Sequence, residues 1–244
     1  MIESSTEKEK KPAHQLWITI HRHGPKASSS GPLSPEGKQL TKQYFDDAYS
    51  GVPASIMQEG VSLEYSPIQR AEETVNIYQI FLAKNGVKVK DRKPDERLSE
   101  GTITSREHVI EQLGGYGGLW VEKWLQTDKG EIQGLKTGKE AVAGFCSWLL
   151  EKVSQTRTSQ TDAEVDAFSH GALILAFMLK LQEKLGQNIV PEDWKERKIL
   201  DNTLGYLSYI NFSFNPDSPE VLVFRFAGQN IEIPIKILKD LAGQ

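Results

Sequence analysis

The stretch LWITIHRHG, residues 16–24, is a short apolar run that ends in two histidines with an arginine between them. Its apolar residues predict a buried strand over 16–21, and the polar residues follow at the end of that strand. His21 and His23 lie two positions apart, so on a strand they share a face and could bind a metal ion. Alternatively, only one histidine carries out chemistry, and Arg22 binds a negatively charged group.

Strand-like and helix-like segments alternate outward from this run. We predict helices over 34–49, 66–86, 137–153, 171–186 and 234–242, and strands over 16–21, 61–66, 87–90, 164–170, 204–213 and 220–228. The candidate helix N-caps are Ser34, Ser66 and Thr137, and Gln69 and Glu140 would complete capping boxes with the last two.

This alternation predicts the fold class. It favours a three-layer α/β/α sandwich with a mostly parallel sheet and an antiparallel edge strand. Residues 1–15 are charged and read as a disordered N-terminal arm, whereas 16–244 read as a single domain. The irregular stretch at about 91–135 reads as an inserted lobe over one edge of the core.

Composition excludes several classes of function. The 244 residues carry a net charge of −4, which disfavours non-specific binding to nucleic acid. One cysteine, Cys146, cannot form an internal disulfide, and its helical, apolar surroundings indicate buried packing. The sequence has neither a membrane span nor an apolar signal-peptide core, so we expect a cytoplasmic protein.

Polar residues follow several predicted strands, at the edge of the sheet where ligands of such folds bind. His23 follows the first strand, Arg70 lies in the first turn of the helix after the second, and His170 starts the helix after the strand 164–170. The carboxylate-rich stretch DERLSEG, residues 95–101, follows the third strand. Helix N-termini attract anions, so two of these positions favour phosphate.

The motifs RHG, LSPEG, SPIQRAEET, LSE and SHG, in this order, resemble the histidine phosphatase superfamily, whose fold is that of phosphoglycerate mutase. The resemblance covers about Leu16 to Tyr209, and Asn202 lies in a segment similar to a late asparagine segment of the family. It implies that His23 is a nucleophile that forms a phosphohistidine and that Arg22 and Arg70 bind the phosphoryl oxygens. It also implies no metal or other cofactor.

The remaining roles implied by the resemblance are those of the proton donor and of further phosphate contacts. His170 would complete the site as a donor, and Glu100 of LSE would be the general acid and base. Lys26 would add a phosphate contact. Three other carboxylates stand near Glu100 as alternatives for the acid, namely Asp95, Glu96 and Glu107.

His21 matches no motif, so we expect it in the core, with a turn at Arg22 that brings Arg22 and His23 into the site. His108 reads as a surface or packing residue with substrate contact as an alternative, and His14 belongs to the arm. A metal hydrolase that uses His21, His23 and His170 is disfavoured, because the positive charge of Arg22 repels a cation.

The predicted function is that of a phosphomonoesterase acting on a small phosphorylated metabolite or similar ester. The alternatives are a phosphoglycerate mutase-type phosphotransferase and a non-catalytic phosphate-binding module. The stretch PKASSSGPLS, residues 25–34, replaces the longer mutase pattern after RHG and favours the phosphatase. The expected partner is a small-molecule phosphate ester, with neither nucleic acid nor membrane; the sequence does not indicate an oligomeric state.

Overall fold

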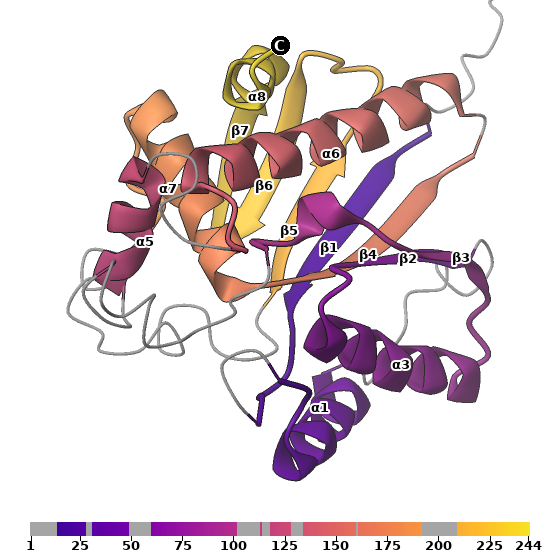
Figure 1. Cartoon of the computed structure of the whole chain (residues 1–244). Helices are drawn as coiled ribbons and strands as arrows, with labels where there is room; N and C mark the ends of the chain where they lie inside the picture. Colours follow the sequence, from indigo (N-terminus) through magenta and orange to yellow (C-terminus); the bar gives the residue numbers. More distant parts are fainter. Residues whose placement is uncertain are drawn as a thin grey trace, which may run out of the picture.

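The computed structural model describes residues 14–27, 31–48, 60–101, 113, 118–127, 134–159, 161–191 and 209–244. These residues form one seven-stranded sheet with helices on both faces (Figure 1). The strands are β1 (Leu16–Arg22), β2 (Val61–Tyr65), β3 (Val89–Pro94), β4 (Ala163–Ser169), β5 (Tyr209–Phe214), β6 (Val221–Phe226) and β7 (Gln229–Pro234). The helices are α1 (Pro35–Ala48), α3 (Gln69–Lys84), the short 3₁₀ helix η1 (Glu96–Leu98), α5 (Gly118–Gln126), α6 (Gly138–Thr158), α7 (Gly171–Leu185) and α8 (Ile235–Ala242).

The strand order is β3-β2-β4-β1-β5-β6-β7. The four strands from β3 to β1 are parallel to one another, and β5, β6 and β7 continue the sheet as antiparallel neighbours. The predicted three-layer α/β/α sandwich is therefore confirmed. Its antiparallel part comprises three strands rather than one edge strand.

Alternating side chains divide the core into two layers, one on each face of the sheet. Ile20 of β1 and Ala167 of β4 belong to the larger layer, beneath α5, α6, α7 and α8. Phe168 of β4 belongs to the smaller layer, beneath α1 and α3. Neighbouring residues at the end of a strand thus reach opposite faces of the sheet, which decides where His21, Arg22 and His23 lie.

Two strand predictions needed correction. The third strand covers Val89–Pro94 rather than 87–90. It is an edge strand whose side chains are all at least partly exposed, so the sequence carries no pattern of buried residues that would define its bounds. The strand β7 was not predicted, although Ile231 and Ile233 are buried between exposed neighbours.

The capping predictions were right for two helices and wrong for one. Ser34 Oγ accepts a hydrogen bond from the Gly37 N–H, 2.8 Å away, before α1. Thr137 and Glu140 form the predicted capping box of α6. The prediction of a Ser66 cap was wrong, because α3 begins at Gln69 and no side chain caps it.

Other predictions lie outside the described residues or are tested only in part. Glu107, His108, Asn202 and residues 1–13 are not described, and the predicted lobe is described only in pieces. Cys146 is fully buried, as predicted, and burial raises the pKa of its thiol to about 12. Among the helices of the described residues, none has both the length and the apolar composition needed to cross a membrane.

Candidate active site

The carboxyl ends of β1, β2 and β4 lie side by side, and backbone hydrogen bonds continue beyond them. The His23 N–H donates to the Ser169 carbonyl at 3.1 Å, and the Ser66 N–H donates to the Phe168 carbonyl at 2.9 Å. The sheet therefore fixes the backbone at His23 and Ser66 relative to β4 and the following His170. Residues that are distant in sequence meet here because parallel strands end at the same edge.

Arg70, at the start of α3, is the centre of the cluster. Its Nε lies 2.9 Å from His23 Nε2, and its Nη2 lies 3.1 Å from His170 Nδ1. The same Nη2 is 3.4 Å from Glu100 Oε1. These four side chains are all buried, with at most 5% of each residue exposed. The structure thus brings together four of the six residues that the sequence singled out, around one guanidinium group.

The hydrogen bonds define the tautomer of His23. Its Nδ1 lies 2.6 Å from the Gly24 carbonyl oxygen, which can only accept, so Nδ1 carries the proton. Its Nε2 faces Arg70, which can only donate, so Nε2 presents its lone pair. The Gly24 N–H in turn donates to Thr74 Oγ1 at 3.1 Å, which ties this backbone to α3. His23 is therefore held as a neutral imidazole with Nε2 directed into the cluster.

Arg22 reaches the site from the other face of the sheet. A Cβ atom on Gly171, the first residue of α7, would lie 2.9 Å from Arg22 Nε, so a glycine is needed for this close approach. The predicted turn at Arg22 was wrong: β1 continues through Arg22, which pairs with Ser169. No turn is needed because His23 lies toward α3 and Arg22 toward α7, at the same end of the sheet.

Burial and positive charge control the pKa values of the two histidines. Burial, followed by the charges of Arg70 and Arg22, holds the pKa of His23 well below its ordinary value, against the raising effect of the Gly24 hydrogen bond. Burial and Arg70 lower the pKa of His170 in the same way, and the charge of Lys26 contributes to both shifts. Both rings are therefore neutral at neutral pH. The sixth singled-out residue, Lys26, thus lies near enough to act on the cluster electrostatically.

Glu100 follows η1 and is buried against the same cations. Burial raises the pKa of its carboxyl above the ordinary value, although Arg70, Lys26 and Arg22 each oppose this rise. Its Oε1 lies at Arg70, whereas Oε2 has no hydrogen-bond partner within the part of the chain that the structure describes. A buried carboxyl group with a raised pKa has the properties of a general acid.

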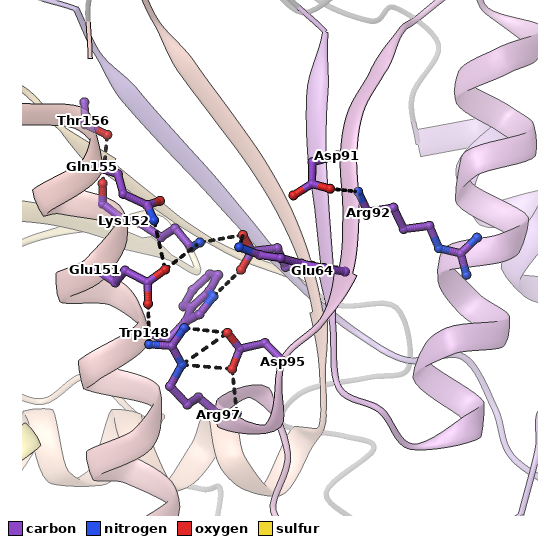
Figure 2. Close-up of polar contacts among 11 residues, drawn as sticks. Glu64, Asp91, Arg92, Asp95, Arg97, Trp148, Glu151, Lys152, Gln155 and Thr156 are labelled. Atoms are coloured by element: carbon purple, nitrogen blue, oxygen red, sulfur yellow. Dashed lines mark hydrogen bonds and ion pairs between the residues drawn. The ribbon is translucent and has the colours of Figure 1, made fainter. Parts of the chain in front are cut away.

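The alternative carboxylate Asp95 is used elsewhere. Figure 2 shows Asp95 paired with Arg97, and their closest contact, between Asp95 Oδ2 and Arg97 Nη2, is 2.6 Å. Arg97 Nη1 also contacts Glu151 Oε2 of α6 at 2.6 Å. Hydrogen bonds to Arg97 lower the pKa of Asp95 in spite of its partial burial, so this group stays ionised. The Glu96 side chain is exposed.

This ion-pair network also fixes the segment that carries Glu100. Beside it, Glu64 of β2 is buried and accepts from Lys152 Nζ at 2.5 Å and from Trp148 Nε1 at 2.6 Å, both on α6 (Figure 2). Lys136 Nζ donates to the carbonyls of Glu96 and Ser99, and Ser169 Oγ donates to the Leu98 carbonyl. Glu100 therefore extends from a backbone that α6 and β4 hold in place.

His21 lies in the core, on the α1 and α3 face of the sheet. It is fully buried and stacks on Phe168 with ring centroids 4.9 Å apart. Its Nε2 is 3.8 Å from Asp166 Oδ1. Among the described residues, no group of three or more His, Cys, Asp or Glu side chains is arranged to hold a metal ion. The pairing of His21 with His23 suggested by their spacing is therefore not formed, because the two rings have different neighbours.

Sequence reasoning missed a contact of Ser66 with the cluster. Its Oγ lies 2.7 Å from His170 Nε2, and the serine is fully buried. The sequence signal was the serine of SPIQR, which we interpreted as a helix cap. The contact joins residues 104 positions apart, so no local pattern reveals it.

No model of a protein family matches the sequence, and no curated protein matches it. Solved structures do share its fold. The mycobacterial glucosyl-3-phosphoglycerate phosphatase is 16% identical, with a TM-score of 0.56 over 89% of this chain and 99% of that chain. The phosphoglycerate mutase of Bacillus anthracis is 12% identical, with a TM-score of 0.54 over 95% of this chain and 97% of that chain. The chain thus shares the fold of these phosphatases and mutases, as the resemblance of its motifs implied.

Proposed function

We propose that this chain is a phosphomonoesterase that hydrolyses a small phosphorylated metabolite through a phosphohistidine intermediate, without a metal ion or other cofactor. The observation that carries the proposal is the position of Arg70, which contacts His23 Nε2, His170 Nδ1 and Glu100 Oε1. The Arg70 guanidinium thereby contacts the three groups that the reaction needs, namely the proposed nucleophile His23, the proposed phosphate-binding imidazole of His170 and the proposed acid Glu100. A phosphate dianion is the ligand that matches these donors in charge and geometry.

In the first step, His23 Nε2 attacks the phosphorus atom of the substrate. The P–Nε2 bond forms while the bond from phosphorus to the ester oxygen breaks, and the electron pair of that bond goes to the leaving oxygen. Glu100 supplies the proton that makes this oxygen an alcohol. Arg22 and Arg70 bind the phosphoryl oxygens, on which negative charge is spread in the transition state.

In the second step, water attacks the phosphohistidine. The Glu100 carboxylate formed in the first step takes the proton of the water, and the bond between phosphorus and Nε2 breaks. Inorganic phosphate leaves, and His23 and Glu100 regain their starting protonation states. His170 and Lys26 contribute positive or donor groups to the phosphate in both steps.

One observation favours hydrolysis over mutase chemistry, and a second supports a site that binds phosphate. Residues 25–34, PKASSSGPLS, follow RHG directly and lack the longer pattern that the mutases carry there. The mycobacterial phosphatase that shares the fold, with a TM-score of 0.53, has been solved both with VO3 and with inorganic phosphate. We therefore propose water as the acceptor, in a cytoplasmic enzyme whose partner is the small phosphate ester.

The first experiment tests this chemistry with a panel of phosphate monoesters. We expect turnover that persists in a chelator and is blocked by vanadate, which mimics a five-coordinate phosphoryl group. The His23→Ala variant should be inactive and take up no label from a ³²P-labelled ester. The His170→Ala variant should still become labelled, although slowly, because it keeps the nucleophile.

Three results would contradict the proposal. Activity that is lost in chelator and restored by zinc would point to a metal hydrolase. A His23→Ala variant with a near-normal rate would exclude the covalent intermediate. Transfer of the label to a second substrate rather than to water would indicate a mutase.

A further inference from the structure

A fully buried hydroxyl lies behind the phosphate-binding cluster and is not used by the proposed steps. Ser66 follows β2, and its N–H donates to the Phe168 carbonyl, so β4 fixes its backbone. Its Oγ is 2.7 Å from His170 Nε2. Its Oγ also accepts a hydrogen bond from the Ile68 N–H at 3.4 Å, just before α3, and the N-cap residue of that helix makes no side-chain cap.

The donor and the acceptor of each hydrogen bond in the cluster follow from two groups, the Gly24 carbonyl, which can only accept, and Arg70, which can only donate. The Gly24 carbonyl accepts a hydrogen bond from His23 Nδ1–H, and His23 Nε2 therefore accepts from Arg70. Arg70 has only donors, so His170 Nδ1 must accept from its Nη2. The single proton of neutral His170 is therefore on Nε2, from which it is donated to Ser66 Oγ.

We propose that Ser66 is the positioning residue of His170: its hydroxyl accepts the Nε2 proton and so directs Nδ1 of the ring toward the phosphate. This inference rests on the proposed function, since it assumes that a phosphoryl group binds at Arg70. Ser66 itself does not reach the phosphate and acts through the imidazole.

Binding of a phosphate dianion would use this arrangement. The dianion neutralises the charges of Arg70, Arg22 and Lys26, which together with burial and His23 lower the pKa of His170. His170 can then take up a second proton at Nδ1 and donate it to a phosphoryl oxygen, while Nε2–H stays bonded to Ser66. Glu100 is the acidic group on the same side of the cluster, and its raised pKa keeps it from competing as a counter-ion.

The test is a double-mutant cycle on the affinity for vanadate and for inorganic phosphate, measured by calorimetry at constant salt. We expect Ser66→Ala to weaken binding by about tenfold, the usual effect of a lost hydrogen bond to a charged group. In the His170→Ala background the same substitution should change the affinity by less than about twofold, because the group through which it acts is gone. Equal losses in both backgrounds would overturn the proposal.

Two further variants separate the hydrogen bond from packing. Ser66→Cys keeps nearly the same volume but is a poor acceptor, so it should weaken binding as Ser66→Ala does; wild-type affinity in this variant would contradict the proposal. Ser169→Ala is the matched control, a buried serine next to His170 whose Oγ donates to the Leu98 carbonyl instead. Its effect on affinity should be the same with and without His170.

The tautomer can also be observed directly. In ¹⁵N-histidine spectra of the ligand-free protein, we expect His170 as the Nε2–H form, because Arg70 can only donate to Nδ1; the Nδ1–H form would overturn the proposal. A wild-type protein that binds neither vanadate nor phosphate would instead refute the proposed function. The affinity cycle and the spectra thus distinguish failure of the Ser66 inference from failure of the function on which it rests.

Discussion

Substitution of Glu100 by glutamine tests its proposed role as the general acid. The variant keeps the shape of the side chain and its contact with Arg70 but removes the transferable proton. Loss of a general acid reduces the rate by about 10²–10⁴-fold when the leaving group needs a proton. An alkyl alkoxide needs it, whereas p-nitrophenolate leaves as a stable anion.

The structure sets how large the effect can be at a given pH. At its ordinary pKa of 4.5, a glutamic acid is only about 1% protonated at pH 6.5. Each unit by which burial raises the pKa of Glu100 increases that fraction by about tenfold until it saturates. The wild-type rate on an alkyl phosphate should therefore fall as pH rises through the raised pKa, and the variant should lack this decline.

The assay is the first turnover, followed in a rapid-mixing instrument with glycerol 3-phosphate and with p-nitrophenyl phosphate. The first turnover is needed because the same residue is proposed to activate water in the second step. We expect Glu100→Gln to slow phosphoryl transfer from the alkyl ester by at least about 100-fold and from the nitrophenyl ester by less than about tenfold. Asp95→Asn serves as the control, and any change in its rate relative to wild type should be the same for both esters.

Two outcomes would refute this reasoning. Equal damage to both esters would give Glu100 a binding role instead of an acid role. An undamaged variant would move the acid to another carboxylate, with Glu107 the first alternative, because Asp95 is held ionised by Arg97 and Glu96 is exposed.

Three further predictions concern residues outside the proposed chemistry. His21→Asn should lower the free energy of unfolding in urea by about 2 kcal/mol while changing kcat less than about threefold, and loss of turnover in a folded variant would place His21 in the site. Burial and the charge of Asp166 raise the pKa of Glu164 to about 8. Ionisation of this carboxyl therefore favours the unfolded state between about pH 5 and 8, so Glu164→Gln should raise Tm over wild type by an amount that grows across this range and then levels off. A gain that does not depend on pH would contradict the raised pKa. Lys152→Met should lower the free energy of unfolding by about 3–5 kcal/mol, because the buried Glu64 carboxylate then keeps only Trp148 and the partly exposed Lys93 as partners. A change below about 1 kcal/mol, the size expected of a surface ion pair, would contradict a stabilising role for the Lys152–Glu64 ion pair.

The sequence was sufficient where the physical cause is local or follows from topology. The capping box of Thr137 and Glu140 depends on residues three apart, and the structure contains it. The meeting of His23, Arg70 and His170 follows from the parallel arrangement of β1, β2 and β4, whose carboxyl ends lie at one edge. Each residue was placed at the end of a predicted strand or in the first turn of the helix that follows it, so the alternation of elements was enough to bring them together.

The errors arose where distant or weak interactions decide the structure. β3 is an exposed edge strand, so its position depends on pairing with β2 rather than on a buried face. β7 follows a turn in which Ala227 has φ 48° and Gly228 φ 78°. Ala-Gly is a weaker turn signal than Asn-Gly, because alanine rarely adopts a positive φ, and the hairpin was missed. Ser66 was interpreted from its near neighbours, but its hydroxyl contacts His170.

The electrostatics of the site connect these residues to the timing of proton transfer. In the ligand-free protein, burial raises the pKa of Glu100 while Arg70, Lys26 and Arg22 oppose the rise. A bound phosphate dianion offsets those same three charges, so their opposition is reduced while the burial remains. We therefore expect the pKa of Glu100 to rise further when a phosphate ester binds, so that the proposed acid is most fully protonated in the complex that needs its proton. After the leaving alcohol has taken that proton, the carboxylate lies beside Arg70, from which position it can accept a proton from water.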